Sequence, residues 1–261
     1  MSALPLNLGG EFMAHTPSNL FSGFVSAVLY HGSANDPIWN KAFGISEVER
    51  KERLFLISNN SPKAKPKKPV NRKYVTYSSI YKHESGEYPI NVTKKSGCYT
   101  QILNRMIEQL LACYSKWKRV FTLRFDLHYK IYTKDNKVIS DFMRRVRAFI
   151  KRNYQINEMG FCWVREIERA KSQHYHVVLF LDGDKVRHSS KLNRAIREMW
   201  ERNSCGNRTM PVVEKPYYLV TDMTGIQEVM WRVSYMAKER GKGYRDIQAK
   251  DYSTSRLKVI S

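Results

Sequence analysis

Two histidines separated by one residue, His174 and His176, are the part of this 261-residue sequence best suited to chemistry. They lead into an apolar run, Val177 to Phe180, which indicates a β-strand. Residues i and i+2 of a strand project from the same face, so both imidazoles should point the same way. Imidazole pairs bind divalent ions such as Mn²⁺ and Zn²⁺. The pair therefore predicts a metal site, although such pairs also occur on strands that bind no metal.

A carboxylate on the preceding strand, expected near residues 160–167, is a candidate third ligand. If the turn between the two strands centres on Ala170, Glu166 lies opposite His174 and on the same face. A register shifted by two residues would bring Glu168 there instead. An odd shift would turn both carboxylates to the other face, where Glu166 would be a surface group paired with an arginine.

A tyrosine and a lysine three residues apart, Tyr235 and Lys238, are the candidate nucleophile and its partner. A helix is expected over about 225–240, with Thr224 near its N-terminal cap and Gly241 at its C-terminal cap, so the two side chains should share a face. A phenol with an ordinary pKa of about 10 is a poor nucleophile at neutral pH, and a nearby ammonium group favours the phenolate. The alternative is a half-buried tyrosine beside a lysine that reaches solvent.

The remaining pattern supplies the elements that would position these groups. Strict alternation over Val120–His128 predicts a strand with one buried face, and Asp126 or His128 on its polar face could compete with Glu166 as the third ligand. The other expected elements are a helix from Thr100 to about 114 with Thr100 as cap, helices near 139–153 and 190–203, and an extended segment over 212–220. A helix followed by β-α-β-β-α-β-α predicts an α+β fold, the ferredoxin-like (split βαβ) antiparallel sheet with helices packed against it.

A strong positive charge indicates the partner. The formal net charge is +21, from 45 Lys and Arg against 24 Asp and Glu, and such an excess favours a polyanion, here nucleic acid over an anionic membrane surface. We divide the chain into an N-terminal region of unknown role (1–57), a basic Pro/Lys-rich linker (58–73), a main domain (95–245) and a C-terminal tail (246–261). The arginines expected to contact nucleic acid are Arg124 and Arg165 on strands and Arg144 and Arg145 on a helix.

The sequence also suggests where the protein acts. No stretch approaches the ~20 apolar residues of a membrane span, and the first residues lack the pattern of a signal peptide. The four cysteines are too widely spaced for a zinc knuckle or a disulfide framework. A cytoplasmic protein with free thiols and no membrane partner is expected.

The order of these features resembles the HUH endonuclease superfamily, in particular its replication-initiator branch with a single tyrosine. The segment Phe121–Asp126 is similar to the first motif of that family, His174-Tyr175-His176 to the second, and Tyr235 with Lys238 to the third. The relaxase branch places its tyrosine near the N-terminus, which this order does not.

A narrower resemblance is to the YagK/YfjJ C-terminal domain, a prophage-encoded family similar to filamentous-phage (inovirus) replication proteins. The stretches that carry it are Arg124–His128, Trp163–Glu166 and His174–Phe180, and the resemblance covers about residues 95–245.

The HUH resemblance implies a DNA-nicking and joining reaction. A divalent ion, Mg²⁺ or Mn²⁺, on His174, His176 and Glu166 would polarise the scissile phosphate, and Tyr235 would attack it with help from Lys238. The products would be a 5′-phosphotyrosine and a free 3′-OH that primes rolling-circle replication of a phage, prophage or plasmid. The substrate would be single-stranded or hairpin origin DNA. The sequence has no Walker A motif, so a host helicase and polymerase are expected partners.

Three alternatives remain open. A non-catalytic prophage DNA-binding regulator would share the fold and the charge but would need neither the metal nor the tyrosine. A metal-dependent hydrolase would use activated water in place of Tyr235. A two-tyrosine mechanism would have to use Tyr244, which lies beyond the expected last helix.

Overall fold

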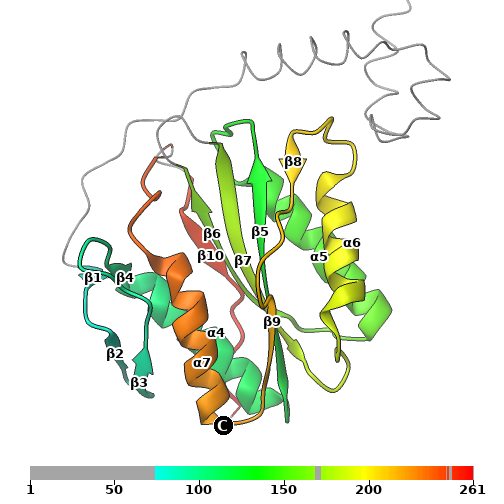
Figure 1. Ribbon diagram of the computed structural model, residues 1–261. Helices are drawn as coiled ribbons and strands as arrows, with labels where there is room; N and C mark the ends of the chain where they lie inside the picture. Colours follow the sequence, from blue (N-terminus) through cyan, green and yellow to red (C-terminus); the bar gives the residue numbers. More distant parts are fainter. Residues whose placement is uncertain (1–73, 168–171, 245, 247–248, 261) are drawn as a thin grey trace, which may run out of the picture.

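A six-stranded antiparallel sheet is the centre of the computed structural model (Figure 1). The structure describes residues 74–260, apart from 168–171, 245 and 247–248. The expected N-terminal region and the basic linker therefore lie outside the described residues. Four α-helices pack on the sheet, which makes the fold α+β, as the sequence predicts.

The strand order gives the strand that carries His174 and His176 a neighbour on each side. The strands of the sheet are β5 (Val120–Tyr129), β6 (Gly160–Glu166), β7 (Gln173–Asp182), β8 (Arg208–Thr209), β9 (Tyr217–Val220) and β10 (Tyr252–Thr254). Their order is β10-β6-β7-β5, and both β8 and β9 pair with the other edge of β5. Strand β7 therefore has a hydrogen-bonded neighbour on each side.

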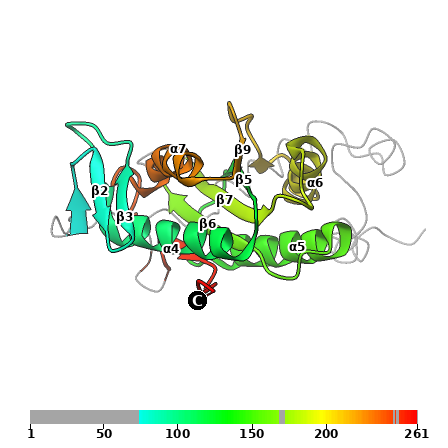
Figure 2. The same cartoon turned by 90° about the horizontal axis from the view of Figure 1, so that it is seen from below.

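Each face of the sheet is covered by a pair of helices. The helices are α4 (Thr100–Lys116), α5 (Lys137–Tyr154), α6 (Ser189–Glu201) and α7 (Met223–Val233), the last continued by the short 3₁₀ helix η3 (Ser234–Ala237). Helices α5 and α6 pack on one face, and α4 and α7 pack on the other (Figures 1 and 2). None of the helices in the described ranges is long and apolar enough to cross a membrane.

Strand β5 shows why two cores form. Its odd-numbered residues, such as Phe121 and Phe125, enter the core under α5 and α6. Its even-numbered residues face α4 and α7, and there Val120, Thr122 and Arg124 are buried as well. The prediction of one buried face on this strand is therefore wrong, because the second pair of helices covers the polar side of the alternation.

The helix that leads to the candidate tyrosine differs from the prediction at both ends. Its N-cap is Asp222, whose side chain accepts a hydrogen bond from the Gly225 amide at 2.8 Å, so Thr224 is not the cap. The α-helix ends at Val233, where the Ser234 hydroxyl donates to the Trp231 carbonyl at 2.8 Å. A side chain that hydrogen-bonds to a carbonyl of the preceding turn favours a tighter helical turn, and the chain continues as a 3₁₀ helix.

Two further elements also differ from the prediction. Tyr99 is the N-cap of α4, and Thr100 is its first helical residue, because the Thr100 hydroxyl donates to the Tyr74 carbonyl at 3.2 Å. In the segment 212–220 only Tyr217–Val220 forms a strand. Pro216 precedes it and has no amide to donate, and its carbonyl accepts instead from the Arg124 amide at 2.7 Å.

Four short strands precede α4, and the segment that contains them contacts η3 and the residue after it. Strand β1 (Val75–Thr76) pairs with β4 (Cys98–Tyr99), and β2 (Ile80–His83) pairs with β3 (Gly86–Pro89). Cys98 forms an isolated antiparallel bridge with Lys238, and the Asn91 amide donates to Ser234 Oγ at 2.8 Å. Strands β1–β3 precede residue 95, and β10 lies in the segment 246–261.

Candidate metal centre and the tyrosine beside it

The register of one hairpin brings a carboxylate to the histidine pair. Strand β6 pairs with β7 so that Glu166 lies opposite His174, and Val164 lies opposite His176. This is the register that a turn centred on Ala170 predicts. Ala170 and the alternative ligand Glu168 lie outside the described residues.

The three side chains form a cluster with the dimensions of a metal site. Glu166 Oε2 lies 3.4 Å from His174 Nε2 and 3.4 Å from His176 Nε2. One ligand atom from each residue falls within 4.8 Å of the others. Ligand atoms bound to one divalent ion at about 2.0–2.2 Å are separated by roughly 3–3.5 Å, so the spacing fits. His176 Nε2 is buried and makes no hydrogen bond, so it is the ring nitrogen that a cation would contact.

A second carboxylate fixes the orientation of His176. Asp126 lies opposite His176 on β5, and its Oδ1 is 2.7 Å from His176 Nδ1. This contact assigns the imidazole proton to Nδ1, which donates it to the carboxylate, and points Nε2 toward Glu166. Asp126 was an alternative third ligand, but here it bonds the nitrogen that faces away from Glu166. Arg124 Nη2 approaches its other oxygen at 3.5 Å.

The second alternative ligand, His128, stands next to the cluster. It lies opposite His174 on β5, with the two ring centroids 5.6 Å apart. Burial and the neighbouring imidazole of His174 lower the pKa of His128. It is not among the three residues whose ligand atoms come together, so Glu166 is the carboxylate that the structure places with the histidine pair.

A buried lysine that the sequence analysis missed completes the charge balance. Lys242 is 1% exposed, and its Nζ lies 2.6 Å from Glu166 Oε1 and also bonds the Lys238 carbonyl oxygen. Burial alone would raise the pKa of Glu166, but the Lys242 ammonium and the two imidazoles hold it well below its usual range. The only signal in the sequence was a lysine between two glycines, Gly241 and Gly243, and no periodicity places such a residue.

Charges also determine the protonation of the paired groups. Burial alone would lower the pKa of His176, but hydrogen bonds and charge from Asp126 and Glu166 raise it to about 9. The pKa of Asp126 moves the other way: burial opposes ionisation, and the contact with His176 lowers the net value. The two carboxylates therefore stay ionised, whereas His176 is protonated at neutral pH, so a cation that binds its Nε2 must replace a proton.

The candidate nucleophile stands at the edge of this cluster. Tyr235 is carried by η3 and is 40% exposed, and its ring centroid lies 5.8 Å from that of His176. Two cations lie over the ring, with Arg124 Cζ at 5.2 Å and Lys238 Nζ at 4.9 Å from its centroid. Although the helix ends earlier than predicted, the tyrosine and the lysine come together.

The arginines that were expected to contact DNA do not gather at one surface. Arg124 is 7% exposed and lies beside the cluster. Arg165 is 1% exposed and projects from the opposite face of β6, where its guanidinium donates to Gln173 Oε1 at 2.6 Å and Asn136 Oδ1 at 3.1 Å. An arginine whose donors are used inside the fold is not available to a phosphate, so the expectation for Arg165 is wrong.

The two helical arginines are exposed but lie on the far side of the sheet. Arg144 and Arg145 belong to α5, which packs on the face opposite to the cluster. Arg144 Nη2 also bonds Asp141 Oδ1 at 2.8 Å. Among the aromatic residues that could stack on bases, Tyr175 and Trp163 are buried in the core, and Trp231 is 48% exposed.

Three comparisons relate the chain to known proteins. The family model of the YagK/YfjJ C-terminal domain matches residues 82–250, which is more than half of the chain. A search of curated proteins gave no match, and neither did a search of solved structures. The Glu-His-His cluster that could bind a metal, its buried lysine and the exposed tyrosine all lie within the matched range. The chain belongs to the YagK/YfjJ C-terminal domain family.

Proposed function

We propose that this protein is a metal-dependent endonuclease that nicks single-stranded DNA through Tyr235 and so initiates rolling-circle replication. The observation that carries the proposal is the position of the Tyr235 ring, 5.8 Å from the His176 ring and open to solvent. A phenol that is 40% exposed beside a candidate metal site can meet a phosphate that the same site holds.

The topology supports an HUH-like, ferredoxin-like domain. Apart from the two-residue strand β8, which lies between α6 and β9, the elements run β5-α5-β6-β7-α6-β9 along the chain, and these four strands stand in the order β9-β5-β7-β6 in the sheet. Both crossover helices, α5 and α6, lie on one face. This order supports a split βαβ unit, with the candidate ligands on the face that α4 and α7 cover.

In the proposed reaction the phenol oxygen of Tyr235 attacks a DNA phosphorus atom. The phenol releases its proton to solvent as a bond forms between its oxygen and phosphorus, the bond from phosphorus to the 3′ oxygen breaks, and the 3′ oxygen takes up a proton from solvent. A divalent ion, Mg²⁺ or Mn²⁺, held by His174, His176 and Glu166 would supply Lewis-acid polarisation of the phosphate. Lys238 and Arg124 flank the ring, so their charges can stabilise the phosphate oxygens as they gain charge.

The experiment that tests the proposal follows the covalent intermediate. Because the 5′ phosphate would remain on the tyrosine, a single-stranded library labelled at its 3′ end should give a labelled protein band that survives denaturation. We expect the band with Mn²⁺, and none with EDTA or in Tyr235→Phe. The control is Tyr217→Phe, which changes a tyrosine of similar exposure (43%) on β9. Cleavage that persists in Tyr235→Phe would replace this mechanism with hydrolysis by activated water.

A non-catalytic DNA-binding regulator is the second candidate, and one contact favours it. The Lys242 ammonium already neutralises Glu166, so the cluster can be stable without a metal. A regulator would bind DNA equally well in Mn²⁺ and EDTA, would show no uptake of metal by titration calorimetry, and would give no covalent band. Either candidate leaves unwinding and synthesis to other proteins, and for the nickase we propose a host helicase and polymerase as these partners.

A further inference from the structure

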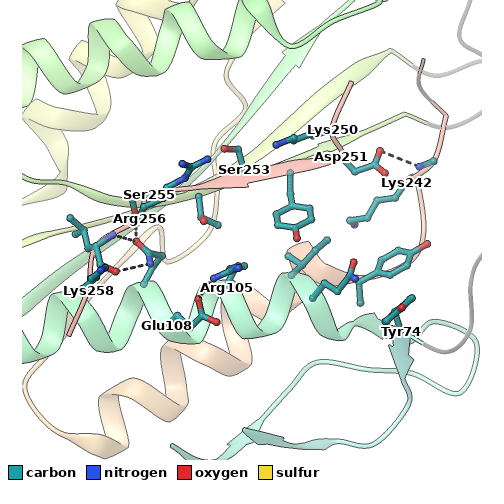
Figure 3. A pocket seen from close by; sticks show the side chains of 18 residues that line it. Tyr74, Arg105, Glu108, Lys242, Lys250, Asp251, Ser253, Ser255, Arg256 and Lys258 are labelled. Atoms are coloured by element: carbon teal, nitrogen blue, oxygen red, sulfur yellow. Dashed lines mark hydrogen bonds and ion pairs between the residues drawn. The ribbon is translucent and has the colours of Figure 1, made fainter. Parts of the chain in front are cut away.

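A groove outside the candidate metal centre has the chemistry of a strand-binding surface. It lies between α4 and the C-terminal segment that carries β10, and its volume is about 940 Å³ (Figure 3). That is near the upper end of the roughly 300–1,000 Å³ that small-molecule sites occupy. Helix α4 packs on the same face of the sheet as the candidate ligands, so the groove and the metal centre share that side.

Positive charge along the groove is largely unneutralised. Lys250, Arg256 and Lys258 line it, are exposed, and form no ion pair with a carboxylate of the described residues, whereas Asp251 adds one negative charge to the lining. Arg105 is the exception, because its Nη1 pairs with Glu108 at 2.6 Å. Exposed cations without acidic partners attract phosphates and release counterions when they bind them.

Aromatic rings stand among these charges. Tyr74, Tyr99 and Tyr252 line the same groove. Tyr252 is carried by β10 opposite Val164 and is only partly buried. Rings interleaved with cations are the combination by which proteins hold single strands, because bases stack on the rings while the cations follow the backbone.

A buried lysine joins the groove to the metal centre. Lys242 lines the groove, and its Nζ lies 2.6 Å from Glu166 Oε1. The other oxygen of that carboxylate faces both imidazoles at 3.4 Å. The side chain of Lys242 therefore lies between the groove and the candidate metal centre, where a phosphate would be cleaved.

We propose that the groove between α4 and β10 binds single-stranded DNA, namely the nucleotides that flank the phosphate presented to the metal centre. The second part of this inference rests on the proposed nicking function. The groove as a single-strand site rests on its own charges and rings. Duplex DNA, whose bases are already stacked on one another, should bind more weakly than a single strand of the same length.

The charge is tested by binding in EDTA, so that no cleavage is needed. A fluorescent oligothymidylate is titrated with the wild-type chain and with the triple variant Lys250→Gln, Arg256→Gln, Lys258→Gln, and anisotropy is followed at several salt concentrations. At about 0.7 per single-strand contact, losing three contacts should reduce the slope of log K against log salt by about 2 and weaken binding about tenfold or more at low salt.

The matched control removes the same charge from α5 on the other side of the sheet, in the triple variant Arg147→Gln, Lys151→Gln, Arg152→Gln. All three are exposed residues of that helix. We expect a change of less than about threefold for this variant. Equal losses in the two triple variants would overturn the assignment of the strand to the groove.

The rings are tested with a strand that has phosphates but no bases. Wild-type protein should bind the oligothymidylate at least about fivefold more tightly than an abasic strand of equal length, and Tyr252→Leu should remove most of that preference. Thermal melting of Tyr252→Leu confirms that the variant is folded. Equal binding of both strands by the wild type would reduce the groove to a general polyanion site and overturn the inference.

These outcomes separate the groove from the nicking proposal. If no covalent band ever forms but the groove variant loses the single strand, the nicking function fails and the groove stands. If the band forms normally and the groove variant binds as the wild type does, the groove fails and the nicking function stands.

Discussion

Two carboxylates lie beside His176, one at each ring nitrogen. Asp126 Oδ1 accepts a hydrogen bond from His176 Nδ1 at 2.7 Å, while Glu166 faces Nε2. A ligand that is oriented in this way loses little rotamer freedom when it binds an ion. The geometry therefore makes Asp126 a positioning residue for the candidate metal site.

The first prediction concerns this positioning. Asp126→Asn keeps the shape but removes the charge that orients and polarises His176, so the affinity for Mn²⁺ should fall about 10–100-fold. Titration calorimetry measures it. Asp141→Asn changes a carboxylate on α5, on the other side of the sheet, and should leave the affinity unchanged. If Asp126→Asn binds Mn²⁺ as tightly as the wild type, Asp126 does not position His176 as a metal ligand.

The ion pair between Lys242 and Glu166 is almost fully buried, with side chains 1% and 10% exposed. A buried pair adds little net stability over apolar residues, but removing one partner leaves a charge without compensation. This asymmetry gives the pair a measurable signature.

The second prediction uses that signature. Lys242→Met should lower the free energy of unfolding by about 3–5 kcal/mol, and adding Glu166→Gln should restore a large part of it. Mn²⁺ should raise the Tm of Lys242→Met more than that of the wild type, because the ion would replace the missing ammonium. Lys258→Met, at an exposed lysine, is the control for denaturant unfolding and melting. A single variant as stable as the wild type would contradict this account.

At the scale of elements, the turn after η3 depends on a glycine. Gly241 has φ of +74°, and a Cβ there would lie 3.1 Å from Glu166 Cβ and Oε2. Its carbonyl accepts from the Ile167 amide at 2.8 Å, which fixes the turn against the end of β6. The glycine therefore combines a left-handed backbone with a close approach to a candidate ligand.

The third prediction separates these two requirements. Gly206 has φ of +75° with nothing within 4 Å of its Cβ position, so Gly206→Ala measures the backbone strain alone, about 1 kcal/mol. Gly241→Ala should lose more than that and should also weaken Mn²⁺ binding, because Glu166 must move. Denaturant unfolding and metal titration give both values. Equal losses and equal metal affinity would show that the contact with Glu166 is unimportant.

The elements also show what the sequence could and could not predict. The pairing of Glu166 with His174 was one of the registers that strand alternation allows, and a turn centred on Ala170 predicts it. The end of the last helix was not predictable, because Ser234 Oγ accepts a hydrogen bond from the Asn91 amide, 143 residues away. Lys242 escaped for a similar reason: its partner Glu166 is 76 residues away, and no local pattern encodes such a contact. Local periodicity therefore gave the ligands on strands but not the groups that long-range packing adds.

At the scale of the whole molecule, one sheet separates two cores, and three of the four cysteines lie in the core under α4 and α7. Burial raises the pKa of Cys98 to about 11 and that of Cys113 to about 12, and it raises the pKa of Cys162 further. Since the thiolate is the reactive species, these thiols react only when that core opens. Cys205, the fourth, is partly exposed.

The fourth prediction follows from this distribution. At mildly alkaline pH a water-soluble disulfide reagent should modify Cys205 rapidly in the native chain and the other three only after denaturation. Absorbance of the released reagent gives the number of thiols, and Cys205→Ser removes the fast phase. Rapid reaction of all four thiols in the native chain would show that the core under α4 and α7 is not closed.

The 3₁₀ turn that bears Tyr235 is held by Asn91 and Cys98, and the chain must therefore fold back over more than a hundred residues before the phenol reaches its place. Such distant contacts close late, because the loop between them must first lose its entropy. During synthesis, a chain that has emerged as far as Val233 carries His174 and His176 but not Tyr235. Under the proposed nicking function, reactivity toward DNA would thus arise only after the segment that carries Tyr235 has been made and has packed against Asn91 and Cys98.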